Sequence, residues 1–344
     1  MDLSARKQAI LSAIVRYHIA TGEPIGSKML AGLLPDAPSP ATLRNEMSEL
    51  CESGYLEQPH TSAGRVPTGK GYRFYVHQLK SPGEVEPDVR RLIDQTLAES
   101  SVDPQGLSET AGALLIRLTG LPSVTASVVD EITAVKRVEV FPMSLHLCML
   151  VVAASDGRTR SRLCRSNAPV DAALIGSFRR VAASSVEGKE LRELTPAYLQ
   201  NVAASAGSGF LSAIPLYTVL CEMLRECSAS DVRLSGESRL FALLKAPDQA
   251  KRLISRLESR DFMLSYLEKA TDPINVLFGN DSSFSEMEPS TAIVARFGTA
   301  GNAAGRIGVI GPNRMPYERI IPRVAYIAKR LSDYTDLNMN DMEG

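Results

Sequence analysis

One stretch of the sequence, residues 58–83, carries several cations and no acid, although the chain as a whole is nearly neutral. The formal net charge at pH 7 is −1, yet Arg65, Lys70 and Arg73 all fall within this stretch and no Asp or Glu does. A surface loop without a charged partner normally mixes both signs. The pattern therefore predicts a negatively charged partner, and the phosphate backbone of nucleic acid is the first candidate.

Side chains that can recognise DNA bases lie just before this stretch. Ser39 followed by Pro40 predicts the start of a helix, because a hydroxyl that caps backbone N–H groups precedes the residue favoured at the first helical position. Apolar residues then recur on one face of the helix and should point to a core: Leu43, Met47 and Leu50. The opposite face has no acid in its first turns. We expect Thr42, Arg44 and Asn45 to contact bases there, since Asn and Arg match adenine and guanine edges.

These side chains need a scaffold, and the first 80 residues supply the elements of a winged helix-turn-helix. Periodicity and turn residues predict helices over 3–20, 25–34 and 39–53, a hairpin with a polar tip at 60–64, and a helix over 71–79. The basic stretch is then the wing and its base, beside the helix that recognises bases. The residues expected to contact phosphates are Ser27, Ser39, His60, Thr61, Arg65, Lys70 and Arg73. One alternative is that these cations are solvated surface charges or form internal ion pairs. Another is that the helix-turn-helix docks a protein instead of DNA.

Composition predicts an ordinary cytoplasmic protein of two or three domains. The chain has 344 residues, of which 44% are hydrophobic and 22% charged. Its five scattered cysteines form no C-x-x-C pair, which favours buried, reduced thiols over a zinc site. The N-terminus lacks the apolar core of a signal peptide. The most apolar run, residues 145–154, is about half the length that spans a bilayer, so we interpret it as a buried strand.

Catalytic and cofactor motifs are absent from the sequence. Glycines cluster over 298–311, but they fit no phosphate-binding motif and lie between two predicted strands, which favours a β-turn. No Ser/His/Asp or Cys/His constellation is evident, and His146 lies in an apolar segment where a core or surface role is expected. We therefore predict no enzyme activity, no cofactor and no metal site.

The remaining sequence predicts a mixed α+β body. Residues 80–87, KSPGEVEP, are typical of a hinge, and two helices follow. Residues 134–166 alternate like strands, with a hairpin turn at Asp156-Gly157. Residues 171–228 become helical, and 248–269 has the pattern of one long amphipathic helix. Two strands over 290–312 and a helix over about 316–333 complete the chain.

Three blocks of the sequence resemble the HrcA family of bacterial heat-inducible transcription repressors. They are TGEPIGSKMLA (21–31), SPATLRNEMSELCESGYLEQPHTSAGRVPTGKGYRFYV (39–76) and GRIGVIGPNRMPYERIIPRVAYIA (305–328). The resemblance implies a homodimeric repressor that binds an inverted-repeat operator and is kept active by the chaperonin GroEL. It also implies a winged helix-turn-helix followed by a GAF-like domain with an inserted helical dimerisation region. The boundaries expected are 1–80 for the DNA-binding domain, 81–104 for a linker, 105–170 and 229–344 for the GAF-like domain, and 171–228 for the dimerisation region.

Two other functions fit the same sequence. A winged-helix regulator could sense a small ligand through the GAF-like domain, and an adaptor could have lost DNA recognition altogether. An effector that changes operator affinity at constant temperature would indicate the first alternative. Binding that ignored DNA sequence and vanished at moderate salt would indicate the second. The leading hypothesis is a sequence-specific repressor of chaperone operons that loses activity on heat stress.

Overall fold

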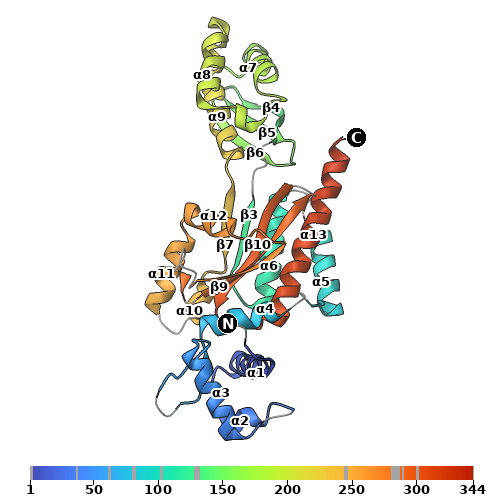
Figure 1. Ribbon diagram of the computed structural model, residues 1–344. Helices are drawn as coiled ribbons and strands as arrows, with labels where there is room; N and C mark the ends of the chain where they lie inside the picture. Colours follow the sequence, from blue (N-terminus) through green and yellow to red (C-terminus); the bar gives the residue numbers. More distant parts are fainter. Residues whose placement is uncertain are drawn as a thin grey trace.

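The computed structural model shows three units arranged along one long axis (Figure 1). It describes residues 3–35, 38–60, 63–79, 83–100, 104–127, 132–243, 247–279, 287–288, 290–299 and 302–343. An N-terminal unit lies at one end, a sheet with helices on both faces forms the centre, and an outer unit lies at the far end. The mixture of helices and antiparallel sheets is the α+β class that we expected.

The N-terminal unit has the predicted order of three helices, a hairpin and a helix. Its elements are α1 (Ala5–Thr21), α2 (Ser27–Ala31), α3 (Pro40–Glu52), β1 (Leu56–Glu57), β2 (Val66–Pro67) and α4 (Gly69–Gln78). The strands pair antiparallel over two residues each. Hydroxyl groups cap the helices: Ser4 accepts from the amide of Lys7, and Thr68 accepts from that of Gly71. Local signals therefore fix the boundaries of these elements.

The central unit is a five-stranded antiparallel sheet that is buried on both faces. Its strands are β3 (Ser123–Ser127), β7 (Asp231–Ser235), β8 (Ile274–Phe278), β9 (Ser290–Thr299) and β10 (Asn302–Pro312), in the order β7-β3-β10-β9-β8. One face packs on α5 (Pro87–Ala98), α6 (Pro104–Thr119) and α13 (Tyr317–Glu343). The other packs on α10 (Ser238–Leu243), α11 (Pro247–Leu257) and α12 (Arg260–Glu268). The two predicted strands are confirmed as β9 and β10, but the glycines expected between them are not in a turn: Gly298 lies in β9, and Gly305, Gly308 and Gly311 lie in β10. Gly301 lies outside the described residues.

The prediction of one long helix over 248–269 is wrong, because α11 and α12 are separate helices. Ser259 lies between them with the extended backbone angles φ −74° and ψ 110°. The break lets both helices bury apolar side chains against the same face of the sheet. Leu253 and Leu257 come from α11, and Met263 and Tyr266 from α12.

The outer unit is a three-stranded sheet packed against helices, with a core of its own. Its elements are β4 (Val135–Ser144), β5 (Leu147–Ala154), β6 (Thr159–Arg165), α7 (Ala172–Ser185), α8 (Pro196–Ser205), α9 (Ile214–Cys227) and the short 3-10 helices η1 (Leu191–Glu193) and η2 (Ser208–Ala213). The inner faces of the strands bury Val138, Leu150 and Cys164 against Phe178 of α7 and Leu220 of α9.

Two expectations about this region need correction. The boundary that we predicted between residues 170 and 171 falls inside the outer unit, because β4, β5 and β6 pack on its helices and not on the central sheet. The fully buried strand predicted at 145–154 has only one buried face. Residues of β5 alternate between buried and half-buried, and His146 lies in the exposed turn before it.

The expected linker over 81–104 is largely occupied by a packed helix. α5 contacts α6 and α13, and its residues Ile93 and Leu97 are buried in a hydrophobic core that continues into the N-terminal unit. That core includes Leu43 of α3 and Ile320 of α13. The N-terminal unit and the central unit therefore share one core.

A close backbone contact holds the base of the wing. Gly64 lies against Ile25, so an added Cβ atom would lie 2.4 Å from the carbonyl carbon and oxygen of Ile25. We expect Gly64→Ala to lower the free energy of unfolding by about 1–3 kcal/mol, the usual cost of inserting a carbon into a packed site. Thermal or denaturant unfolding measures the change.

The matched control is Gly32→Ala in the same unit. Its Cβ atom would meet only the carbonyl oxygen of Met29, at an ordinary 3.4 Å, and its backbone is right-handed helical. We expect a change of less than about 1 kcal/mol there, because the smaller entropy of the unfolded chain is its main effect. Equal losses in both variants would show that the contact with Ile25 does not matter.

Candidate nucleic-acid interface

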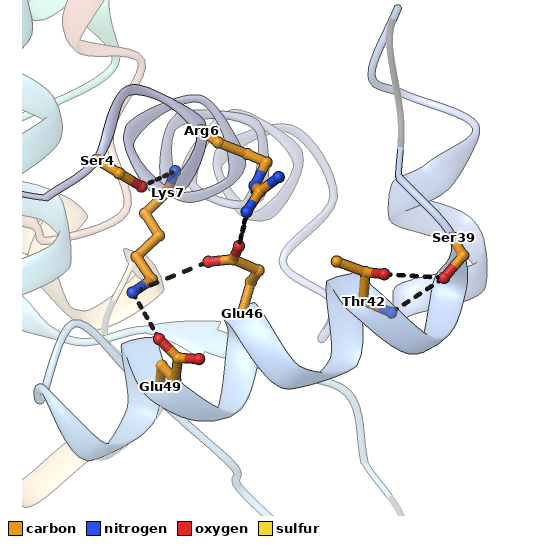
Figure 2. Close-up of polar contacts among 7 residues, drawn as sticks. All are labelled: Ser4, Arg6, Lys7, Ser39, Thr42, Glu46 and Glu49. Atoms are coloured by element: carbon orange, nitrogen blue, oxygen red, sulfur yellow. Dashed lines mark hydrogen bonds and ion pairs between the residues drawn. The ribbon is translucent and has the colours of Figure 1, made fainter.

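The helix predicted to recognise bases begins at the predicted residue. The Ser39 hydroxyl accepts a hydrogen bond from the backbone amide of Thr42 at 3.2 Å and lies 3.0 Å from the Thr42 hydroxyl (Figure 2). Pro40 occupies the first position of α3. The Ser39 hydroxyl thus caps α3. The first turn of α3 contains no acid, so no negative side chain neutralises the positive end of the helix dipole.

The two faces of α3 are those that the sequence predicts. Leu43, Met47 and Leu50 are buried in the shared core, whereas Arg44 and Asn45 are exposed. Neither exposed side chain forms a hydrogen bond or ion pair with the part of the chain that the structure describes. Both are therefore available to a ligand that approaches this face.

The acids further along α3 are neutralised by the first turn of α1. Arg6 contacts Oε1 of Glu46 through Nε at 2.9 Å and through its terminal nitrogen at 2.8 Å (Figure 2). Lys7 Nζ lies 2.5 Å from Oε2 of Glu49 and 3.9 Å from Oε2 of Glu46. The hydrogen bond with Glu49 is the main cause of a raised pKa at Lys7, so this cation stays charged. Two carboxylates that would repel phosphates are paired in this way.

Sequence reasoning missed this ion-pair cluster, although a signal for it exists. Arg6 and Lys7 stand in the first turn of α1, where the helix dipole disfavours cations. Two cations in such a place indicate a partner from elsewhere in the chain. Glu46 is the partner of these cations. Its side chain is only 9% exposed, and a buried carboxylate requires a cation or hydrogen-bond donors.

The wing is held against the start of α2 by a backbone bridge. The amide of Ile25 donates to the carbonyl of Arg65 at 3.1 Å, and the amide of Arg65 donates to the carbonyl of Ile25 at 2.9 Å. The Arg65 side chain is half-buried, and its buried Nε has no hydrogen-bond partner among the described residues. His60 is exposed at the turn of the wing, and Thr61 lies outside the described residues.

The other residues predicted to contact phosphates differ in exposure and in the contacts that they form. Lys70 is exposed, donates to the carbonyl of Ser53 at 2.8 Å and lies over the Tyr55 ring at 4.3 Å, beside the C-terminal end of α3. Ser27 is the first residue of α2 and is half-buried, but it does not cap the helix, since Gly26 is the N-cap and no side chain bonds there.

Arg73 contacts the central unit. Its guanidinium lies 5.4 Å from the centre of the Phe278 ring, which belongs to β8 of the central unit. The sequence assigns it to phosphate binding because Arg73 is near the wing in the chain. On the helix α4, however, it occupies the face that packs on the central unit.

Within the described ranges, no helix is long and apolar enough to cross a membrane. The same residues contain no cluster of three or more His, Cys, Asp or Glu side chains that could hold a metal ion.

The ion-pair cluster gives a stability prediction. Glu46→Gln keeps the shape of the side chain but removes its charge from Arg6 and Lys7. We expect it to lower the free energy of unfolding by about 1 kcal/mol, with the loss shrinking at high salt. Glu52→Gln is the control, because Glu52 is exposed on the same helix and has no partner among the described residues. The cluster would be irrelevant to stability if both variants unfolded at the same denaturant concentration as the parent.

Comparisons with known proteins identify the family to which the chain is similar. A family model described as the HrcA protein C terminal domain matches residues 105–321. The heat-inducible transcription repressor HrcA of Nocardia farcinica (strain IFM 10152) is 33% identical, over 95% of this chain and 96% of the relative. The repressor of the same name from Thermoanaerobacter sp. (strain X514) is 29% identical over 99% of both chains.

A solved structure shows the same fold. The crystal structure of a hypothetical protein matches with a TM-score of 0.71 and 23% identity, over 97% of this chain and 99% of that chain. The relatives extend over nearly the whole sequence and favour a repressor over a ligand sensor, and the resemblance carried by the three sequence blocks is confirmed. The chain belongs to the HrcA family, whose curated relatives are named heat-inducible transcription repressors.

Proposed function

We propose that this protein is a heat-inducible transcription repressor that occupies operator DNA through its N-terminal unit. The observation that carries the proposal is the exposed face of α3. Its first turns present Arg44 and Asn45 without an acid, and the carboxylates of Glu46 and Glu49 are already paired with cations. A helix of this kind can lie in a major groove without repelling the phosphates on either side.

Base recognition is assigned to Thr42, Arg44 and Asn45. Asn and Arg can each form two hydrogen bonds to one purine edge, which makes them the specific contacts. Contacts to the sugar-phosphate backbone are assigned to the capped end of α3, the start of α2 and the wing, through Ser27, Ser39, His60, Thr61, Arg65 and Lys70. We leave Arg73 out of the DNA interface because its guanidinium stacks on Phe278.

An apolar sheet face supports a homodimer. On the outer face of the β4-β5-β6 sheet, Phe141, Met149 and Leu163 are aligned across the three strands. Phe141 is 47% exposed and Leu163 61%, with Met143 (59%) and Leu145 (67%) nearby in sequence. The solvent face of an antiparallel sheet is normally polar, so an apolar row indicates an interface. A second copy fits best, because an inverted repeat requires two DNA-binding units related by a two-fold axis.

Heat sensitivity follows in this proposal from the small free energy of unfolding that proteins have. At high temperature a fraction of the repressor molecules unfolds and releases the operator. GroEL, the partner that the family resemblance implies, returns these molecules to the native state. We expect the protein to act in the bacterial cytoplasm, where the chromosome lies, and to have no enzymatic activity. Operator binding after heating, with and without GroEL, tests the heat-dependent step.

DNA recognition is tested by fluorescence anisotropy at fixed salt. The labelled duplexes are an inverted-repeat chaperone operator and a copy with one half-site scrambled. We expect Arg44→Ala to remove about 1–3 kcal/mol of the preference for the intact repeat, because a base contact is lost. Lys70→Ala should weaken binding to both duplexes alike and lower the salt slope by about 1, as expected for one phosphate contact.

The control for Arg44→Ala is Arg252→Ala, which removes an exposed arginine from α11 of the central unit. It should leave both affinities unchanged. The assignment of α3 fails if Arg44→Ala behaves like this control, and the repressor function fails if the parent protein binds both duplexes equally weakly even with GroEL.

The dimer surface is tested by sedimentation equilibrium. Leu163→Asp places a charge on the most exposed residue of the apolar row, so we expect the dimer dissociation constant to rise by a factor of about 30 or more. Leu33→Asp is the matched control, since Leu33 is a half-exposed leucine of the N-terminal unit. A Leu163→Asp protein that stays as dimeric as this control would mean that another surface holds the two copies together.

A further inference from the structure

The carboxylate of Glu318, in the first turn of α13, joins two helices of the N-terminal unit to the central unit. Oε1 of Glu318 accepts hydrogen bonds from Arg16 of α1, at 3.1 Å from Nε and 2.9 Å from the terminal nitrogen. The same oxygen accepts from the Tyr75 hydroxyl of α4 at 2.7 Å. One side chain therefore fixes α1 and α4 at the same time.

The Tyr75 hydroxyl is well suited to a lasting contact. Tyr75 is buried, and burial together with the bond to Glu318 raises its pKa to about 12. The phenol therefore keeps its proton at any physiological pH and remains a donor. The pKa of Arg16 is also raised, mainly by its hydrogen bond with Tyr75, so the guanidinium keeps its charge.

Aromatic residues form a second contact beside this one. The rings of Tyr72 in α4 and Tyr317 in α13 lie 6.3 Å apart, and both residues are buried. Nδ1 of His18 lies 2.5 Å from the Tyr72 hydroxyl, and the Tyr317 hydroxyl donates to the carbonyl of Asn313 at 2.7 Å. Both polar ends of the aromatic pair are thus occupied inside the interface.

Further contacts join the N-terminal unit to the central unit. The guanidinium of Arg314 lies so close to Gly22, at the end of α1, that an added Cβ atom would be 2.3 Å from it. Arg73 lies over Phe278 as described. Contacts distributed in this way restrict rotation as well as separation.

This interface leaves the base-recognition face open. α3 packs on α1, α2 and β1, and α4 contacts β8 of the central sheet. α2 and α3 accordingly lie at the end of the molecule that points away from the sheet (Figure 1). The interface therefore orients α3 without covering it.

We propose that Glu318 is a positioning residue for DNA recognition, which sets the angle at which each copy of the repressor presents α3 to its half-site. The inference rests on the proposed function. It adds the residue that makes operator affinity depend on the spacing between half-sites. A rigidly held pair of recognition helices fits one spacing, whereas a loosely tethered pair accepts several at lower affinity.

The test compares operators that differ only in spacing. Three labelled duplexes are used: the inverted repeat at its natural spacing, the repeat with two base pairs inserted at its centre, and a single half-site. Two base pairs move one half-site by about 7 Å and rotate it by about 70°, given one turn per 10–10.5 base pairs. Anisotropy is measured on the full-length protein at fixed salt.

Two variants break the contact conservatively. Glu318→Gln removes the charge, and Tyr75→Phe removes the donated hydrogen bond. Their controls are Glu258→Gln, an exposed carboxylate of the central unit, and Tyr17→Phe, a hydroxyl of α1 without a partner among the described residues. The double variant shows whether the two changes act through one contact, in which case it is no worse than the stronger single variant.

The parent protein should lose at least about tenfold in affinity on insertion, because the second half-site moves out of reach. In Glu318→Gln and Tyr75→Phe we expect natural-spacing affinity to fall about tenfold and the insertion penalty to shrink below about threefold. Half-site affinity should stay within about threefold of the parent, since α3 itself is intact. The controls should match the parent on all three duplexes.

Three results would contradict the inference in distinguishable ways. An unchanged insertion penalty in both variants would show that Glu318 does not set the angle, while the repressor function stands. Tighter binding of the variants at natural spacing would show that the interface holds α3 away from DNA. A parent protein that does not prefer the repeat to the half-site would overturn the proposed function, and the inference with it.

Discussion

In the function that we propose, α3 enters a groove of DNA, so it must be supported by the protein from one side only. Its buried side meets α1 through Leu43 and Met47 and through the pairing of Glu46 with Arg6. That pairing does two things together. It anchors the helix, and it removes a negative charge from the neighbourhood of the phosphates, where an unpaired carboxylate would be costly.

The same demand for one-sided support extends through the chain. α1 and α4 form hydrogen bonds with Glu318 at the start of α13, and α13 packs against the central sheet. Because the hydrophobic core runs without a break from α3 to α13, the DNA-binding unit is part of the body of the protein and not a separate module on a tether. The outer unit differs, since it has its own core and leaves the apolar row of its sheet exposed.

Local signals in the sequence predicted local structure well. Ser39 and Pro40 were sufficient to predict the start of α3, because capping involves atoms within three residues of one another. The partners of Arg73 and Glu46 could not be identified from the sequence, because each partner lies far away in the chain. The strands at 134–166 show a related limit, since alternation predicts a strand but not the sheet to which it belongs.

The contact between Arg16 and Glu318 joins residues 302 positions apart. During synthesis, α1 to α4 leave the ribosome long before the segment that orients them exists. Until then, the buried faces of Tyr72 and Tyr75 lack their partners on α13. Contacts of such sequence separation form late and slowly, so a newly made chain exposes apolar surface for most of its synthesis. The N-terminal unit can therefore reach its final position relative to the central sheet only after α13 has been synthesised.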